Sequence, residues 1–314
     1  MTAFWIAIAL KATLWAALMS TAALVVPAQH PRARRFLALL GMWGLWLVPW
    51  LPMPWPGLSV APIAVAPSGA SLPGGWLLLL TLVWAFGSLL LLLRVVRDVS
   101  GIQRLVRHST KCTLNAGAAV EVRLTSEIEG PCMTGWLRPC VLLPLEAVSW
   151  PEDTLRATLR HECQHARQRD GLHRFCAALV RAVFWWNPAM HVVCGIYEAE
   201  SEICCDEEAV SSCSRREYGE MLLAHATSQT PSQTFAMSFA RRSGLRVRLQ
   251  RLFETRRASR WAVSTRWLTA WLLILGATFL MASIRVMSPA LAHGISLKDE
   301  ARLRLMADPF PGAP

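Results

Sequence analysis

Four long apolar stretches constrain the fold of this chain more than any other feature of its sequence. Each approaches the length of about 20 residues that a helix needs to cross the hydrocarbon core of a bilayer. Hydrophobic residues make up 54% of the chain, which is more than a soluble globular domain usually contains. We therefore expect a mainly α-helical polytopic membrane protein with about four transmembrane helices, over residues 4–26, 36–55, 76–96 and 267–284.

Two of these stretches have features that compete with a membrane span. Prolines at positions 49, 52, 54 and 56 break the far end of the second. The first has the position of a secretory signal peptide, but no basic residue precedes its apolar run, and that run is longer than a signal-peptide core. We expect the first stretch to be a retained span, with cleavage as the alternative.

Arginines beside the apolar stretches predict how the chain crosses the membrane. The link "QHPRARR" between the first two stretches contains three arginines, whereas the link after the second has no charged residue. Basic segments also follow the third stretch and precede the fourth. Because basic links remain on the cytoplasmic side, we expect three spans in 1–96, a cytoplasmic domain over 97–265, a fourth span in 266–286, and a short extracytoplasmic tail over 287–314. In this arrangement both termini lie outside.

Cysteine usage and net charge agree with this topology. All nine cysteines lie between Cys112 and Cys213, within the expected cytoplasmic domain, where thiols remain reduced. The net charge of +11 is explained by the arginines near the membrane, which attract anionic lipid. We therefore expect the bilayer to be a partner. No nucleic-acid-binding motif accompanies the charge, so direct nucleic-acid binding is not expected.

The expected cytoplasmic domain combines a few strands with several helices. Residues 119–125 alternate like a strand, and 130–144 have the pattern of a turn followed by an apolar strand, which together predict a small β-hairpin or sheet. The segment "SWPE" from Ser149 resembles a capping box and predicts a helix that ends near Asp170. Further helices are expected over residues 173–186, 189–210, 216–226 and 244–255.

The pattern H-E-x-x-H within the first of these helices indicates metal chemistry. Positions four apart lie on one helical face, so His161 and His165 can direct two imidazoles at one ion, and Glu162 lies beside them. Two neutral nitrogen ligands and a carboxylate that takes a proton from metal-bound water are what a zinc hydrolase requires. The competing interpretation is a chance match on a solvated helix.

A third protein ligand is needed, and a later helix offers two glutamates on one face. Glu202 is the better choice because Asp206, one turn further along, could accept the second ring N–H of a ligating histidine. Glu198 lies one turn earlier, and spacing alone leaves it open. The single histidines His173 and His191 rank lower, and Cys204 and Cys205 would suit a structural site better than an open catalytic one.

The segments "LRHECQHARQRDGL", "FWWNPAM", "ESEICCDEEAV" and "REYGEMLLA" follow one another between the third and fourth apolar stretches. In this order, after "GPCMTGWLRPCVLLP", they resemble the BlaR/MecR-type antirepressor membrane metallopeptidases, and the resemblance extends over nearly the whole chain. It implies a zincin-like α+β domain in which His161, His165 and Glu202 hold one zinc ion per chain. Asp206 matches the family's aspartate behind the ligands, and Glu162 remains the catalytic base.

The resemblance also implies a function. We expect an endopeptidase that, after a signal from outside, cleaves itself, a winged-helix transcriptional repressor, or both; a homodimer is an open expectation. Members that sense β-lactams have a large penicillin-binding domain with an S-x-x-K motif after the last span. About thirty residues follow the last span here, without that motif, so direct β-lactam acylation is not expected.

Two other functions compete with this expectation. A quality-control membrane protease similar to HtpX or to CAAX-type peptidases would use the same metal chemistry. A non-catalytic membrane sensor would keep the metal for structure alone, although such a protein has no need of Glu162. The residue that stabilises the oxyanion is not identified by the sequence, and Tyr218 and Arg215 are candidates.

Overall fold

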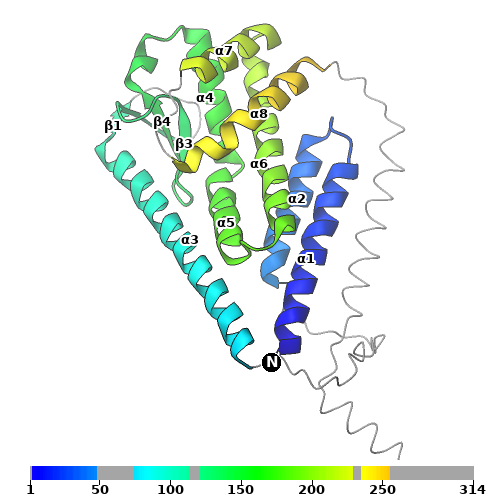
Figure 1. The fold of residues 1–314 in the computed structure, drawn as a ribbon. Helices are drawn as coiled ribbons and strands as arrows, with labels where there is room; N and C mark the ends of the chain where they lie inside the picture. Colours follow the sequence, from blue (N-terminus) through cyan, green and yellow to red (C-terminus); the bar gives the residue numbers. More distant parts are fainter. Residues whose placement is uncertain (1, 48–73, 113–119, 229–234, 255–314) are drawn as a thin grey trace, which may run out of the picture.

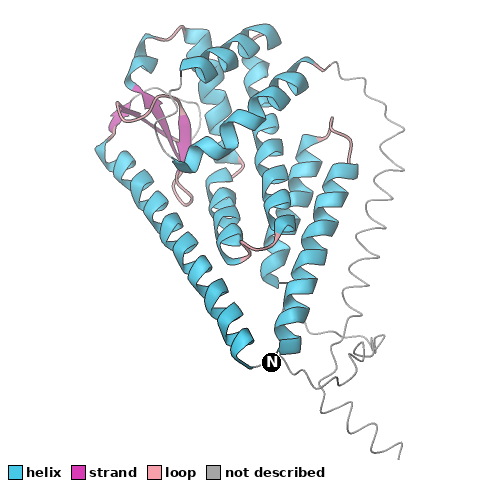
Figure 2. Ribbon diagram, viewed as in Figure 1, coloured by secondary structure: helices cyan, strands magenta, loops and turns pink. Residues whose placement is uncertain are grey.

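The protein is mainly helical, with one small mixed sheet at one end (Figure 2). The computed structural model describes residues 2–47, 74–112, 120–228 and 235–254. Figure 1 shows α3 along one side of the molecule and the α1–α2 hairpin along the other, with α4, α5 and α6 between them. The helices are α1 Thr2–Val25, α2 Pro31–Leu47, α3 Gly74–His108, α4 Glu152–Arg167, α5 Asp170–Val183, α6 Pro188–Ala209, α7 Arg215–Ser228 and α8 Phe235–Phe253.

The α1–α2 hairpin is packed against α6 and shares a core with it. Met19 and Met42 of the hairpin and Val193 and Tyr197 of α6 are completely buried in one cluster. The helices approach closely at Gly41, where an added Cβ would lie 2.6 Å from a methyl group of Val193. Burial of this apolar surface fixes the hairpin against the helix that carries the third predicted ligand. The first two apolar stretches therefore correspond to α1 and α2, and the second extends into residues 48–55, which lie outside the described residues.

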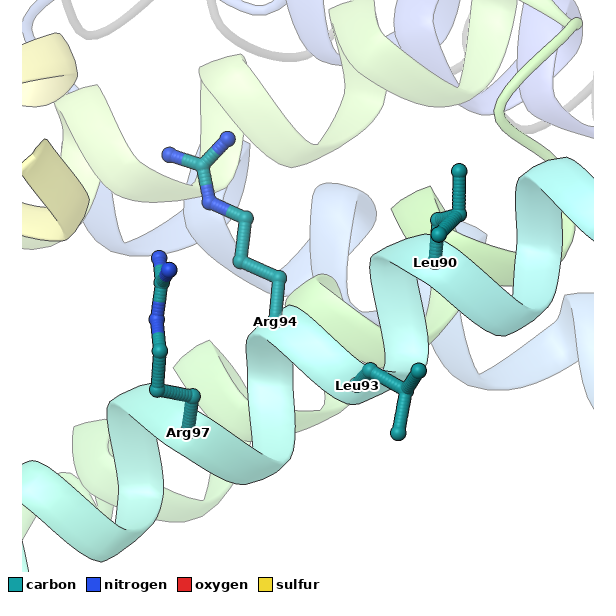
Figure 3. A pocket seen from close by; sticks show the side chains of 4 residues that line it. All are labelled: Leu90, Leu93, Arg94 and Arg97. Atoms are coloured by element: carbon teal, nitrogen blue, oxygen red, sulfur yellow. The ribbon is translucent and has the colours of Figure 1, made fainter.

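Helix α3 differs from the hairpin because most of its apolar surface is exposed. Among the residues that the structure describes, it contains the one segment, Leu78–His108, that is long and apolar enough to cross a membrane. Its C-terminal half becomes basic, and Figure 3 shows Leu90, Leu93, Arg94 and Arg97 around an open recess at this transition. The helix runs without a break through the expected domain boundary at residue 97. The fourth expected span and the tail lie outside the described residues.

The expected hairpin or sheet is a four-stranded mixed sheet in the order β1-β2-β4-β3. Strand β2 pairs in parallel with β4, and β1 and β3 are antiparallel edge strands. Gly135, after β3, has a φ of +86°, a left-handed conformation that glycine adopts without a steric penalty. The strands are β1 Thr110–Cys112, β2 Glu121–Thr125, β3 Cys132–Thr134 and β4 Cys140–Pro144, followed by short 3₁₀ helices over Leu145–Ser149 and, later, Val210–Ser212.

The junction between α4 and α5 is tight. Arg169 has a φ of 54°, and this single left-handed residue ends α4 before α5 begins at Asp170. An added Cβ at Gly171 would lie 2.3 Å from the carbonyl oxygen of Gly135, which brings the start of α5 against the turn after β3. The predicted capping box does not form, because Pro151 occupies the N-cap position and the Ser149 hydroxyl donates to the Glu146 carbonyl oxygen (2.8 Å).

Candidate metal centre

The two histidines of the motif face each other on α4. Their Nε2 atoms lie 3.2 Å apart, and both side chains are buried. Two imidazole nitrogens bound to one tetrahedral zinc at 2.0–2.1 Å would lie roughly 3.3 Å apart, so the observed spacing fits a shared ion. Because the four-residue spacing repeats almost once per helical turn, α4 alone produces this arrangement.

Glu202 lies on α6, which packs against α4, and its carboxylate faces the Nε2 atoms of both histidines. Its carboxylate oxygens lie 3.6 Å from the Nε2 atom of His161 and 3.6 Å from that of His165. All three ligand atoms lie within 4.8 Å of one another. Glu198, the alternative, is one turn earlier on α6 and accepts two hydrogen bonds from Arg181, at 2.5 and 3.0 Å. The geometry therefore favours Glu202 as the partner of the two histidines.

A carboxylate that the sequence analysis did not select lies behind His165. The Nδ1–H group of His165 donates to Oδ2 of Asp170 at 2.7 Å, which directs Nε2 toward Glu202. Asp170 has no exposed surface. The position of Asp170 depends on the left-handed conformation of Arg169 before it. Nothing in the sequence distinguishes this aspartate from any other at a helix end, so its contact with His165 could not be predicted.

Behind His161 lies a chain of two further groups. The Nδ1–H group of His161 donates to the Tyr218 hydroxyl at 2.9 Å, and that hydroxyl donates to Oδ1 of Asp206 at 2.7 Å. Asp206 itself lies 3.3 Å from the same ring nitrogen. Asp206 is thus next to a histidine, as the sequence predicted, but Tyr218 bridges the two. Tyr218 is buried behind the ring, and Arg215 donates to the Leu252 carbonyl oxygen, so neither oxyanion candidate faces the histidine Nε2 atoms in this conformation.

Glu162 lies on α4 beside the edge strand β3. Its Oε2 accepts a hydrogen bond from the backbone N–H of Met133 at 2.6 Å. The carboxylate is buried, with 7% of the residue surface exposed, and the backbone contact fixes its direction. The outer edge of β3 and the expected catalytic base therefore lie next to each other.

Two arginines contact Glu202, one at each carboxylate oxygen. Arg174 of α5 donates to Oε1 at 2.5 Å, and Arg248 of α8 lies 3.1 Å from Oε2. Arg248 also forms two hydrogen bonds with Asp206, at 2.5 and 2.8 Å. A carboxylate has about four acceptor positions, so these contacts leave Glu202 capacity for an ion. Neither arginine was singled out by the sequence, because both come from basic helices without a metal-site pattern.

The charges of the centre favour a cation between the histidines. Burial raises the pKa of Asp206, but Arg248 and His161 outweigh burial and lower this pKa to about 2. Burial lowers the pKa of His161, but the Asp206 and Glu202 carboxylates, 3.3 and 3.6 Å from its ring nitrogens, outweigh burial and raise this pKa to about 9. The carboxylates thus stay ionised and stabilise positive charge on the imidazoles, which a divalent ion can supply in place of a proton.

A second group of ligand types lies next to the first. Cys205 Sγ and an Asp170 oxygen both lie close to Nδ1 of His165, with Sγ at 3.3 Å. Burial raises the pKa of the Cys205 thiol well above its usual range, which opposes the thiolate that binds zinc. Because Nδ1 already donates to Asp170, the group formed by His161, His165 and Glu202 fits an ion better. His173 and His191 belong to neither group, and they contact Trp43 and the Trp185 carbonyl oxygen instead.

The sequence of this chain matches a protein-family profile and is similar to two regulatory proteins. The profile of the BlaR1 peptidase M56 family matches residues 66–252. "Regulatory protein BlaR1" of Bacillus licheniformis is 28% identical over 119 residues, which cover 37% of this chain and 20% of that protein. "Methicillin resistance mecR1 protein" of Staphylococcus aureus strain Mu50 is 24% identical over 162 residues, which cover 46% of this chain and 28% of that protein.

The matched segment contains α3, the sheet and every residue of the centre described above. These relatives are longer proteins, of which the matched parts are less than a third. The family profile itself covers more than half of this chain. The chain therefore belongs to the BlaR1 peptidase M56 family, a family of membrane metallopeptidases.

Proposed function

We propose that this protein is a zinc endopeptidase that acts in signal-regulated proteolysis at the cytoplasmic side of a bacterial inner membrane. The observation that carries the proposal is that the ligand atoms of His161, His165 and Glu202 lie within 4.8 Å of one another. Glu162 follows His161 on the same helix, and its carboxylate is held by the Met133 N–H. The three ligands would hold one zinc ion and leave a position open for water or substrate. Asp170 and Tyr218 would fix the ring orientations of the two histidines.

Zinc in this position would polarise the scissile carbonyl and acidify a water molecule. Glu162 would take the proton from that water and pass it to the leaving amine. The backbone N–H of Met133 holds one oxygen of Glu162, so the other oxygen can turn toward the reacting water. Proton transfer by Glu162 is the step that the protein's own residues supply.

The edge strand β3 supports a binding mode for the substrate. Among the described residues, β3 is paired on one side, with β4, and its Met133 N–H points away from β4 to Glu162. An extended peptide that added to this edge as a further strand would carry its backbone past the catalytic carboxylate. The alternative is that β3 serves only to position Glu162.

The membrane arrangement is part of the same proposal. Four spans, with 97–265 in the cytoplasm, would place the centre beneath the inner membrane surface, within reach of a cytoplasmic protein. A winged-helix repressor, the chain itself, or both would be the substrate, as the resemblance to antirepressor peptidases implies. The family match favours this function over general quality control of membrane proteins.

The test replaces Glu162 with glutamine in the full chain. The Glu162→Gln variant should retain one zinc ion per chain but lose cleavage of the chain itself and of a co-expressed repressor encoded beside its gene. Glu152→Gln, on the exposed first turn of the same helix, is the matched control and should cleave normally. Cleavage by the Glu162→Gln variant at the wild-type rate would refute the assigned role. Degradation of unrelated misfolded membrane proteins by the wild type would favour the quality-control alternative.

The ligand assignment has its own test. Glu202→Ala should lower zinc occupancy strongly, whereas Glu198→Ala, which removes the partner of Arg181, should leave it near the wild-type level. Metal analysis of the two purified variants measures the zinc content per chain and so compares two glutamates that lie one helical turn apart. Loss of zinc with Glu198→Ala alone would exclude Glu202 as the third ligand. If the protein is instead a non-catalytic sensor with a structural metal site, the wild type should bind zinc but cleave no substrate.

A further inference from the structure

The α1–α2 hairpin reaches the metal centre through Arg35, at the start of α2. This residue lies outside residues 66–252, the part of the chain that matches the peptidase family. Its Nη2 donates to Oδ1 of Asp170 at 2.6 Å and to the Gln168 carbonyl oxygen at 3.1 Å. Only 14% of the Arg35 side chain is exposed. The guanidinium is thus embedded between the hairpin and the turn that joins α4 to α5.

The Asp170 carboxylate accepts hydrogen bonds from residues of three other helices. His165 of α4 and Ser201 of α6 donate to Oδ2, at 2.7 and 2.5 Å. Arg35 of α2 and Tyr197 of α6 donate to Oδ1, both at 2.6 Å. The Arg35 guanidinium also lies over the Tyr197 ring, 5.5 Å from its centroid. One buried carboxylate therefore joins α2, α4, α5 and α6.

Arg35 is the only one of these four donors with a permanent charge. A fully buried carboxylate is strongly unfavourable unless it is paired and hydrogen-bonded. Histidine that binds metal through Nε2 donates from Nδ1 as a neutral ring, so it does not replace the guanidinium as a counter-charge. The ionised, fixed Asp170 that orients His165 thus depends on a residue of the hairpin.

We propose that the α1–α2 hairpin is a working part of the metal centre, in which Arg35 is a positioning residue that holds Asp170 and, through it, the ligand His165. This inference rests on the proposed function, because it assigns a role around the same ion. It also gives the hairpin a means of control. A shift of α2 by about 1–2 Å, a size common in switching proteins, would break the contact with Asp170 and release His165 from its orientation.

The neighbouring arginines provide matched controls. Arg34 is similarly buried and forms an ion pair with Glu200 at 2.7 Å, but within the described part of the chain Glu200 forms no hydrogen bond or ion pair with either histidine. Arg32 is exposed on the same turn of α2. All three carry one positive charge in the same link, so a change at any of them alters the expected topology signal equally.

The experiment measures zinc affinity of the full chain in detergent by competition with a chelator of known affinity. Arg35→Gln should raise the zinc Kd about 10- to 100-fold, the range found when groups behind a metal ligand are removed. Arg34→Gln should lower the melting temperature but keep the Kd within about twofold of wild type. Arg32→Gln should change neither quantity. In an Asp170→Asn background, Arg35→Gln should have little further effect on the Kd, because Arg35 acts through Asp170.

Equal zinc Kd values for folded Arg35→Gln and Arg34→Gln would overturn the inference. If Arg35→Gln alone does not fold, the Asp170→Asn background decides, because the neutral amide removes the buried charge that Arg35 balances. A further rise of more than about tenfold in the zinc Kd when Arg35→Gln is added to Asp170→Asn would then overturn the inference. Failure of the proposed function has a different signature, since the wild type and both controls, Arg34→Gln and Arg32→Gln, would then bind no zinc.

Discussion

The α1–α2 hairpin and helix α3 have the same sequence signature but different structural roles. Both combine an apolar helix with arginines at one end. In α3 the apolar surface is exposed, and 72% of the Arg97 side chain is accessible. In the hairpin one apolar face is buried against α6, although Leu24, Phe36 and Leu47 on other faces are exposed. The side chains of Arg34 and Arg35 are only 10% and 14% exposed.

This difference shows that arginines beside an apolar stretch can mean two things. A charge that only sets the topology needs no specific partner and can remain in water or among lipid headgroups. Arg34 and Arg35 instead have partners 133 or more positions away, in the segment that carries the metal centre. The basic link, which the sequence analysis interpreted as a topology signal, therefore also contacts the segment that carries the metal centre.

The largest effect is expected at the shared carboxylate. Asp170→Ala removes the partner of Arg35 and leaves a buried guanidinium without a counter-charge. Breaking a buried pair in this way lowers the free energy of unfolding by about 3–5 kcal/mol. Chemical unfolding in detergent micelles measures this loss, and zinc analysis should show reduced occupancy. A loss below about 1 kcal/mol would mean that the hairpin and the centre are energetically independent.

A smaller effect is expected for the neighbouring pair. Glu200→Leu leaves Arg34 without its partner and should lower the free energy of unfolding by about 1–3 kcal/mol. The double variant Arg34→Met with Glu200→Leu should recover most of that loss, because apolar replacements of a buried ion pair are often neutral. Thermal unfolding of the three proteins gives the comparison. A double variant less stable than both single variants would mean that the two losses add and that Arg34 and Glu200 are hardly coupled, which would contradict this expectation.

The smallest effect is expected on α3. Arg97→Gln removes an exposed charge whose nearest acidic partner, Asp98, lies at 3.7 Å. The free energy of unfolding should change by less than about 0.5 kcal/mol, and the zinc Kd should remain the same. The same assays used for Arg35→Gln provide the contrast. A loss of zinc affinity here would remove the distinction between the two sets of arginines.

The parts of the centre that depend on local spacing were predictable from the sequence. The histidines converge because they are four apart on one helix, and the segments around Glu202 resemble those of a known family. The role of Asp170 was not predictable, because it requires the left-handed conformation of Arg169 at the end of α4. Arg35 was interpreted only as a topology signal, since its partner lies 135 positions away. The contact between Met133 and Glu162 likewise depends on how the sheet packs against α4.

The most direct test of the central claim is X-ray absorption at the zinc edge of the purified full chain. The account predicts one zinc with two imidazole nitrogens and carboxylate or water oxygens at about 2.0–2.2 Å, and no sulfur neighbour. A sulfur scatterer at about 2.3 Å would assign the ion to the group that contains Cys205, and would contradict a centre formed by His161, His165 and Glu202.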